Sequence, residues 1–410
     1  MSSSGQRARE LGRQLVRHYV LTNPRKGSRI LRSAGLGAGA SLSSRWRSFA
    51  FPPTTLIVRI THRCNLRCVQ CGQWGEHGVW KQERPEQLAD ELTTAEWVEL
   101  IDTHRRALSH IYVWGGEPLL RNDLWEIIAA ASRRGITTEL STNGTLLRAQ
   151  HERVAESGLD YLSVSLDGPA KVNESIRRGP GNGYSAVLDG VQALMDRKRR
   201  MGQRLPLTEI CMTLTEANQE EIRSLYEVAK GLGVDVFHVQ FGIFSTEPLL
   251  AMSETRFRRA FGGEPRFFRG FERDVAGMRA DSIRDQLAWI KRDVDTQAAP
   301  LYRQTPAVAY DIDDYFHRPE RFLGRPWCAI PWQYLQVMPN GDVAFCMDFA
   351  DFIAGNVRTE DLLSIWNGPR ARKFREELMA GGPFAACSRC CTWLASASKL
   401  ALILRQALRR

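Results

Sequence analysis

The grouping of its cysteines constrains this chain more than any other feature. Eight of the nine cysteines lie in two groups, and Cys211 stands apart from both. Grouped cysteines in odd number argue against a disulfide framework and favour metal binding in a reducing compartment. The first group is Cys64, Cys68 and Cys71, and the second group is Cys328, Cys346, Cys387, Cys390 and Cys391.

The length and composition are those of a folded protein with more than one structural unit. The 410 residues suffice for two or three units of roughly 150 residues each. Hydrophobic residues make up 43% of the chain and charged residues 25%, which excludes a disordered or collagen-like protein. The sequence contains no run of about 20 apolar residues and no apolar core of a signal peptide, so we expect a cytoplasmic protein.

Positive charge is concentrated at the two ends of the chain. Residues 1–53 form a basic extension, in which the first 50 residues hold ten Lys and Arg against one acidic residue. Residues 394–410 form a cationic amphipathic tail with no acidic residue. The rest of the chain is nearly neutral, so we expect no nucleic-acid partner. Peripheral contact of both ends with an anionic membrane is one interpretation, and basic segments packed on the protein are the other.

Strand-like and helix-like segments alternate between residues 54 and 244. The strand-like segments are apolar, β-branched runs at residues 56–60, 110–114, 136–141, 161–166, 207–214 and 234–241. Strands that alternate with helices pair in parallel through right-handed crossovers. The pattern predicts an α/β fold in which residues 54–244 form a partial (β/α)6 barrel of the TIM type.

The remainder of the chain lacks this alternation. Residues 245–325, which are rich in Arg, Phe and Asp, are predicted to be a helical connector. Residues 326–393 are predicted to be a small α+β domain, because Asn340-Gly341 marks the turn of a hairpin. Two short helices are predicted to follow, at residues 359–367 and 369–379.

The first cysteine group directly follows the first predicted strand, with the spacing C-x3-C-x2-C. Three thiolates on one loop can bind three irons of a [4Fe-4S] cluster and leave the fourth iron open to a small molecule. A structural zinc site needs four closed ligands and is the alternative, with His62 or His77 as the fourth ligand.

Loops at the ends of the following strands carry glycines and polar residues. They are Gly115, Gly116, Glu117 and Pro118; Ser141 and Asn143; Ser165 and Asp167; and Arg177, with Arg178 beside it. Together with the cysteine loop, they resemble the radical S-adenosylmethionine (SAM) superfamily. The resemblance implies that these residues bind SAM, with the glycine loop at its amino group and Arg177 or its neighbour at its carboxylate. Parallel strands end at one edge of a sheet, so we expect the loops to converge on one pocket.

The second cysteine group resembles the SPASM domain, an auxiliary iron–sulfur domain of radical SAM enzymes. Cys328 and Cys346 flank Gly341 with the spacing of its opening, and fewer cysteines follow than in a full SPASM domain. The resemblance implies one auxiliary [4Fe-4S] cluster, held by Cys328, Cys346, Cys387 and either Cys390 or Cys391. A zinc ribbon is the alternative.

The resemblance also implies a function. The protein is expected to cleave SAM reductively to a 5′-deoxyadenosyl radical that abstracts hydrogen from a substrate C–H bond, with a reductase such as flavodoxin or ferredoxin as its partner. The expected substrate is a small metabolite or lipid that is oxidised, cyclised or epimerised, and a ribosomal peptide is the alternative. A non-enzymatic zinc or iron–sulfur protein is the alternative from another class. Cys211 is expected to be a packed strand residue, with hydrogen-atom donation as its alternative role.

Overall fold

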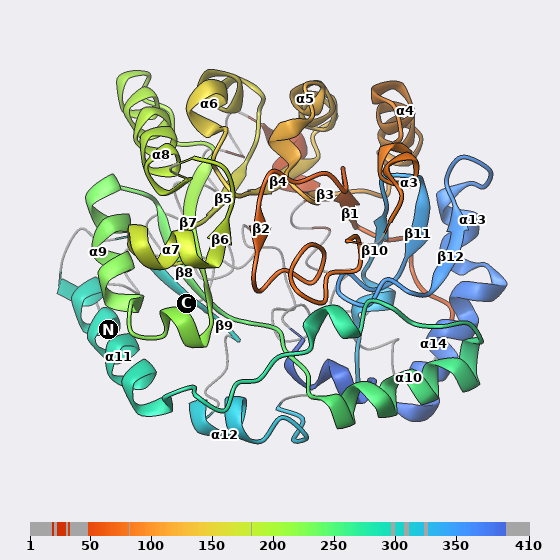
Figure 1. Cartoon of the computed structure of the whole chain (residues 1–410). Helices are drawn as coiled ribbons and strands as arrows, with labels where there is room; N and C mark the ends of the chain where they lie inside the picture. The colour runs from red at the N-terminus through yellow and green to blue at the C-terminus, as the bar shows by residue number, and fades with distance from the viewer. Residues whose placement is uncertain are drawn as a thin grey trace.

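One ten-stranded sheet organises the molecule (Figure 1). The computed structural model describes residues 19, 23–29, 32, 48–81, 83–181, 183–296, 300–306, 311–323 and 327–390. Across the sheet, the strands lie in the order β12-β11-β10-β1-β3-β4-β5-β7-β8-β9. Their bounds are β1 Thr55–Arg59, β3 His110–Trp114, β4 Thr137–Thr142, β5 Tyr161–Ser165, β7 Leu207–Leu214, β8 Val236–Phe241, β9 Leu301–Thr305, β10 Tyr334–Val337, β11 Asp342–Ala344 and β12 Ile353–Asn356.

Strand pairing identifies the sheet as an open barrel. Every neighbouring pair from β10 to β9 is parallel, and β11 and β12 form an antiparallel edge. The six predicted strands are all present, β3 and β7 with the predicted bounds and the others within two residues of them. In the described part of the chain, the edge strands β12 and β9 do not pair with each other. The predicted α/β fold with a partial barrel is therefore confirmed.

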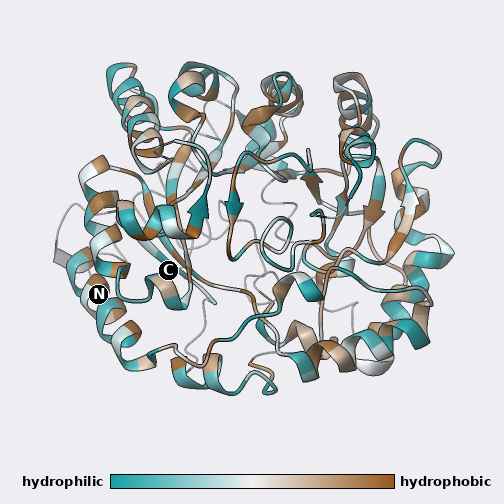
Figure 2. Cartoon of the chain, viewed as in Figure 1, coloured by the Kyte–Doolittle hydropathy of each residue, from teal (hydrophilic) through white to brown (hydrophobic). Residues whose placement is uncertain are grey.

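Helices lie along the outer side of the curved sheet (Figure 1). Figure 2 shows hydrophobic and hydrophilic residues intermixed along them, as expected for helices with one face on a core and one in water. The helices are α3 Pro85–Ala89, α4 Thr94–His104, α5 Leu124–Arg133, α6 Leu147–Glu156, α7 Ala170–Ile176, α8 Gly183–Arg200, α9 Ile222–Leu232, α10 Glu247–Phe261, α11 Ala280–Thr296, α12 Ile312–His317, α13 Leu362–Asn367 and α14 Pro369–Gly381.

Side chains along β7 alternate between two environments. Ile210, Met212 and Leu214 belong to the buried apolar core. Glu209 and Cys211 alternate with them and therefore point to the opposite, inner face of the curved sheet. The polar side chains of β7 therefore face the interior of the barrel, whereas its apolar side chains on the outer face pack against the helices.

Residues 245–325, predicted to be helical, also contain a strand. β9 pairs in parallel with β8, with Leu301 opposite Val236, and extends the sheet at its edge. Its sequence, LYRQT, is short and mostly polar, and most of its residues are half-buried. An edge strand needs no buried apolar run, so the prediction of a connector made only of helices is wrong at β9.

The C-terminal hairpin joins the barrel sheet. β10 and β11 are antiparallel, and Gly341 in their turn has a φ of 90°, as the predicted hairpin requires. β10 also pairs in parallel with β1, with Tyr334 opposite Thr55. This pairing holds the segment that contains the second cysteine group against the first strand of the barrel.

Part of the N-terminal extension packs on the barrel. The buried Lys26 ammonium lies 2.8 Å from the Asp160 carboxylate, which also accepts a 2.8 Å hydrogen bond from the Tyr19 hydroxyl. Asp160 directly precedes β5, at the edge opposite to the strand ends that carry the predicted site. The tail at residues 394–410 lies outside the described residues. Within those residues, no helix has the length and apolar character needed to cross a membrane.

Candidate functional site

The loop after β1 presents Cys64, Cys68 and Cys71, all half-buried. Backbone N–H groups point at their sulfurs: Leu66 N lies 3.4 Å from Cys64 Sγ, and Trp74 N lies 3.4 Å from Cys71 Sγ. Amide hydrogen bonds to sulfur stabilise thiolates and help to set the potentials of iron–sulfur clusters. The loop therefore offers three neighbouring thiol ligands, and backbone N–H groups favour the charged form of Cys64 and Cys71.

Burial opposes ionisation of these thiols. It raises the pKa of Cys64 to about 11 and that of Cys68 to about 12, and the charge of Arg177 acts in the opposite direction on Cys68. Because a thiol must lose its proton to bind a metal, cluster assembly on this loop is coupled to proton release.

A two-stranded ribbon fixes which of the two adjacent arginines faces the cysteines. β2 (Arg67–Cys68) pairs with β6 (Arg177–Arg178), and Arg177 lies opposite Cys68. The Arg177 side chain is 11% exposed and its Nε lies 2.8 Å from Asp167 Oδ2, whereas Arg178 is exposed. Arg177 is therefore the arginine at the candidate site, and the sequence alone leaves this choice open.

The glycine loop after β3 packs directly on the cysteine loop. A Cβ on Gly115 would lie 2.5 Å from Thr61 O, and one on Gly116 would lie 2.1 Å from Arg63 O. Gly116 N also donates a 2.8 Å hydrogen bond to Thr61 O. Only glycine permits this approach, so both glycines hold the loop with the cysteines in place.

Glu117, the next residue, is fully buried and joins this loop to the loop after β4. Its carboxylate accepts hydrogen bonds from Thr142 Oγ1 at 2.6 Å, Asn143 N at 2.7 Å and Leu119 N at 2.9 Å. Pro118 is buried and begins the short 3-10 turn that follows. The observed partners of Glu117 are thus residues of the chain, and its carboxylate fixes the positions of two loops.

The remaining predicted residues lie around the same loops. Asn143 Nδ2 donates to Asn65 Oδ1 at 2.9 Å, and Asp167 Oδ2 accepts from Gln70 Nε2 at 2.6 Å. Ser141 Oγ lies 2.9 Å from the Tyr112 hydroxyl. Ser165 is half-buried at the end of β5, opposite Cys211 of β7. The structure thus brings together the cysteine loop and the ends of β3, β4 and β5.

The second cysteine group surrounds the carboxylate of Asp348. Cys390 is buried with its Sγ 3.2 Å from Asp348 Oδ2, and Cys346 Sγ accepts the Phe349 N–H at 3.2 Å. Burial raises the pKa of Cys328 to about 12, and burial and the charge of Asp348 raise the pKa of Cys346 and of Cys387. Cys391 lies outside the described residues.

Ligand spacing separates the iron–sulfur and zinc alternatives. Zinc–sulfur bonds of about 2.3 Å would bring thiolates to within about 4 Å of one another. Among the described His, Cys, Asp and Glu residues, the one group of three whose ligand atoms all lie within 4.8 Å of each other is Glu209, Cys211 and His238. No three of the described cysteines therefore have zinc spacing, and sets of three and four thiols are the donor sets of [4Fe-4S] clusters.

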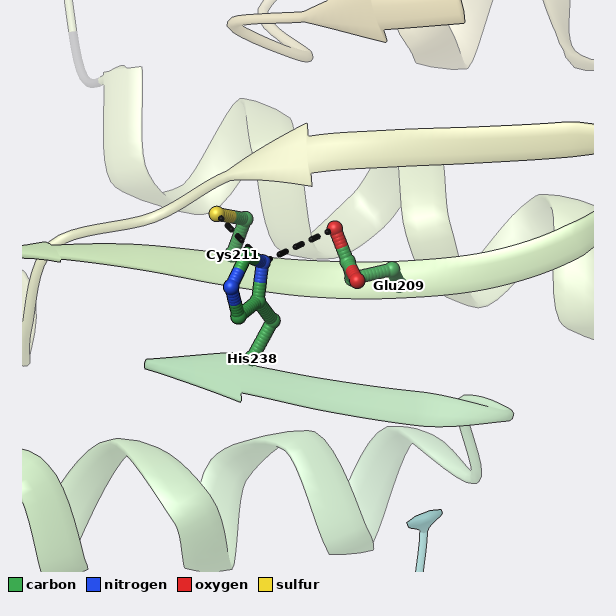
Figure 3. A group of neighbouring side chains, drawn as sticks. All are labelled: Glu209, Cys211 and His238. Atoms are coloured by element: carbon green, nitrogen blue, oxygen red, sulfur yellow. Dashed lines mark hydrogen bonds and ion pairs between the residues drawn. The ribbon is translucent and has the colours of Figure 1, made fainter. Parts of the chain in front are cut away.

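Glu209, Cys211 and His238 form a cluster on the inner face that the sequence analysis missed (Figure 3). His238 Nδ1 lies 3.3 Å from Cys211 Sγ and 3.4 Å from Glu209 Oε1. Glu209 also accepts hydrogen bonds from the Tyr161 and Ser163 hydroxyls, both at 2.7 Å. Cys211 is therefore part of a polar network rather than a purely apolar packing residue, and the pairing of two strands, which creates the network, has no local signal in the sequence.

The fold and the site together define an iron–sulfur protein built on a partial α/β barrel. The family model of the radical SAM superfamily matches residues 58–229, and the model of the SPASM iron–sulfur cluster-binding domain matches residues 328–391. The chain belongs to the radical SAM superfamily and carries a C-terminal SPASM domain. This membership implies SAM and a [4Fe-4S] cluster as cofactors, and the SPASM domain implies auxiliary iron–sulfur binding.

Curated relatives match this chain to different extents. Pre-heme d1 synthase of Dinoroseobacter shibae is 31% identical over 196 residues, which are 47% of this chain and 45% of the relative. AdoMet-dependent heme synthase of Methanosarcina barkeri is 35% identical over 46% of this chain and 50% of the relative. PqqA peptide cyclase of Granulibacter bethesdensis is 25% identical over 82% of this chain and 80% of the relative. The chain thus spans about half the length of the two synthases and four fifths of the cyclase.

Solved structures share the fold. SuiB of Streptococcus suis bound to S-adenosylmethionine has a TM-score of 0.56 and 17% identity over 82% of this chain and 70% of that chain. The anSMEcpe protein with bound AdoMet and a peptide has a TM-score of 0.53 and 14% identity over 79% of this chain and 82% of that chain. At these identities the likeness concerns the fold.

Proposed function

We propose that this protein is a radical SAM oxidoreductase that removes a hydrogen atom from a C–H bond of its substrate. One observation carries the proposal: the three-cysteine loop meets the glycine loop and the buried pair of Arg177 and Asp167 at the ends of the parallel strands. With the cluster and SAM bound, the site supplies a 5′-deoxyadenosyl radical that abstracts hydrogen.

Residues of this chain hold and orient the cofactors in this proposal. Cys64, Cys68 and Cys71 would bind three irons and leave the fourth to SAM. Arg177 would hold the SAM carboxylate, and the loop of Gly115 and Gly116 would hold its amino group. The buried Glu117 joins that loop to Asn143 through a 2.7 Å hydrogen bond and so fixes the two loops relative to each other.

The second cysteine group provides an electron acceptor. Cys328, Cys346, Cys387 and Cys390 would hold an auxiliary cluster, and such a cluster makes a net oxidation of the substrate chemically balanced, because it takes up the electron left after hydrogen abstraction. Cys390 is favoured over Cys391 as the fourth ligand because its thiol is buried beside Asp348.

We infer a peptide as the substrate class. The relatives that cover 82% of this chain include PqqA peptide cyclases, whereas the matched synthases cover only about half of it. The small metabolite or lipid expected from the sequence is the competing class. The basic ends, which would favour a lipid surface, lie largely outside the described residues, so peripheral membrane contact, the cytoplasmic location and the flavodoxin or ferredoxin partner stay predictions.

SAM cleavage tests the activity. Reconstituted protein with a chemical reductant should form 5′-deoxyadenosine, and the Cys64→Ala, Cys68→Ala, Cys71→Ala triple variant should form none, because the open iron is lost. The triple variant should keep the auxiliary cluster, visible by its absorption and iron content. Continued 5′-deoxyadenosine formation by this variant would overturn the assignment.

Deuterium transfer tests the substrate class. Extracts of cells grown in deuterated medium are separated into peptide, polar-metabolite and lipid fractions and incubated with the protein and unlabelled SAM. Deuterium in 5′-deoxyadenosine marks the fraction that contains the substrate, because the transferred hydrogen comes from its C–H bond. We expect label from the peptide fraction, and label from the lipid or metabolite fraction alone would reject the peptide.

A further inference from the structure

Arg59, the last residue of β1, is a buried cation that the described residues pair only in part. Its side chain is 1% exposed, and its Nη2 donates a 3.1 Å hydrogen bond to the carbonyl of Met347. Its Nε and Nη1 have no hydrogen-bond acceptor among the described residues. Buried N–H groups of a charged side chain are costly to leave unpaired, so this arginine requires an explanation.

Aromatic rings hold the guanidinium in a dry setting. Its carbon lies 4.5 Å from the ring centre of Trp114, 5.3 Å from that of Phe267 and 6.0 Å from that of Trp80. Trp114 is itself fixed, because its Nε1 donates to Gln336 Oε1 at 3.1 Å. The rings stabilise the cation and exclude water, but they offer no anion to Nε and Nη1.

The position of Arg59 lies at the junction of the two cysteine groups. Arg59 ends the strand that leads into the first cysteine loop, and its hydrogen-bond acceptor, Met347, is the residue after Cys346 of the second group. Burial lowers the pKa of Arg59 to about 10, and the charge of Asp348 opposes this shift. The pairing of β1 with β10 creates this junction. A fixed positive charge in a water-poor site acts more strongly on a nearby cluster than a surface charge does.

We propose that Arg59 is a positioning residue that raises the reduction potential of the auxiliary cluster. A [4Fe-4S] cluster with four thiolates is negatively charged, and reduction adds one more negative charge, which a buried cation stabilises. The same charge offsets the cost of placing that cluster inside the protein. The proposal rests on the proposed function, since it requires that the second cysteine group binds iron and sulfide.

Redox titration of the auxiliary cluster tests the proposal. The full chain with Cys64→Ala, Cys68→Ala and Cys71→Ala isolates its signal, and the electron paramagnetic resonance of the reduced cluster is followed against potential. Adding Arg59→Met or Arg59→Gln should shift the midpoint to lower potential, because the charge is removed. With Arg59→Lys instead, the midpoint should lie close to that of the parent, because a positive charge is kept at this position.

Arg121 provides the matched control. It is also a buried arginine near the end of β1, but its N–H groups are paired with Ile60 O, Leu92 O and the carboxylates of Glu91 and Asp123. Arg121→Met should leave the midpoint where it is in the parent. An equal shift of the midpoint in Arg121→Met would mean that the loss of any buried arginine in this region changes the potential, and it would overturn the proposal.

Further outcomes are also decisive. An unchanged midpoint in Arg59→Met and Arg59→Gln, or a Lys variant that shifts as far as they do, would overturn the proposal. If Arg59→Met and Arg59→Gln both fail to assemble the auxiliary cluster, Arg59→Lys decides. Assembly of the cluster in Arg59→Lys would support a role for the positive charge, and failure to assemble would overturn the proposal. Zinc in place of iron in the parent protein would instead reject the auxiliary cluster of the proposed function.

Discussion

At the scale of single residues, charge at the site depends on which side chains are buried beside the cysteines. Glu117 is buried, which raises its pKa, yet hydrogen bonds from Thr142, Asn143 and Leu119 favour its charged form. Arg177 is half-buried and paired with the buried Asp167, and its neighbour Arg178 is exposed, because successive residues of the short strand β6 face opposite sides. The polar groups of the site are therefore paired within the chain: Glu117 accepts three hydrogen bonds, and Arg177 forms an ion pair with Asp167.

This pairing makes the two arginines a matched test of SAM binding. Arg177→Ala should weaken SAM binding about 10- to 100-fold, the loss expected when a charge-assisted hydrogen bond worth roughly 1.5–3 kcal/mol is removed. Arg178→Ala should bind SAM like the parent, because that side chain points to solvent. Equilibrium dialysis of SAM against reconstituted protein measures both affinities. Iron content should be unchanged in both variants, and equal affinity in the two would mean that the pocket lies elsewhere.

Glu117 allows a second measurement on the same pocket. Glu117→Ala removes three hydrogen-bond acceptor contacts from a fully buried position, so it should lower SAM affinity and also destabilise the protein by about 2–4 kcal/mol. Chemical denaturation and SAM dialysis of the same preparation follow the two effects. A variant with parent-like stability and affinity would show that Glu117 does not hold the two loops.

At the scale of elements, β1 connects both halves of the site. Its C-terminal end leads into the cysteine loop, and its two sheet neighbours are β3, which leads into the glycine loop, and β10 of the SPASM domain. The apolar run at 56–60 predicts the strand, but its pairing with β10 comes from a segment almost 280 residues later and has no local signal. For the same reason the sequence does not predict that Arg59 lies beside Cys346.

Strand and motif predictions succeeded where the signal is local. The six buried runs and the Gly341 turn each depend on neighbouring residues, and all are present. β9 was missed because an edge strand needs no apolar run. The network of Cys211 with His238 was missed because it depends on strand register, which a single sequence does not specify.

The contact between the glycine loop and the cysteine loop predicts a specific defect. In Gly116→Ala the new Cβ would lie 2.1 Å from Arg63 O, so the cysteine loop must move and the SAM cluster should assemble poorly. Gly231→Ala in α9 is the control, because no atom lies within 4 Å of its added Cβ, and it should stabilise the helix by about 0.5–1 kcal/mol. Iron and sulfide analysis after reconstitution checks the difference, and full cluster loading in Gly116→Ala would contradict it.

At the scale of the whole molecule, the N-terminal extension is tied to the barrel on the side away from the site. The buried pair of Lys26 and Asp160 makes this connection, and Asp160 also accepts a hydrogen bond from Thr138 N. Lys26→Met should leave Asp160 as an uncompensated buried charge and lower the free energy of unfolding by about 3 kcal/mol. Chemical denaturation measures the loss, with Lys171→Met at an exposed position of α7 as the control. A loss no larger than that of the control would mean that the contact does not contribute.

The metal content of the whole protein tests the two-cluster assignment. Wild-type protein reconstituted without oxygen should carry about eight irons and about eight sulfides, since each [4Fe-4S] cluster holds four of each. Cys346→Ala should reduce both to about four, because Cys346 lies in the buried group around Asp348. Cys390→Ala should do the same, because its thiol lies 3.2 Å from Asp348 Oδ2, and Cys391→Ala should keep both clusters. About four irons together with one zinc in the wild-type protein would instead mean that the SPASM domain binds zinc. The proposed SAM cleavage at the first cluster would not be affected by that result.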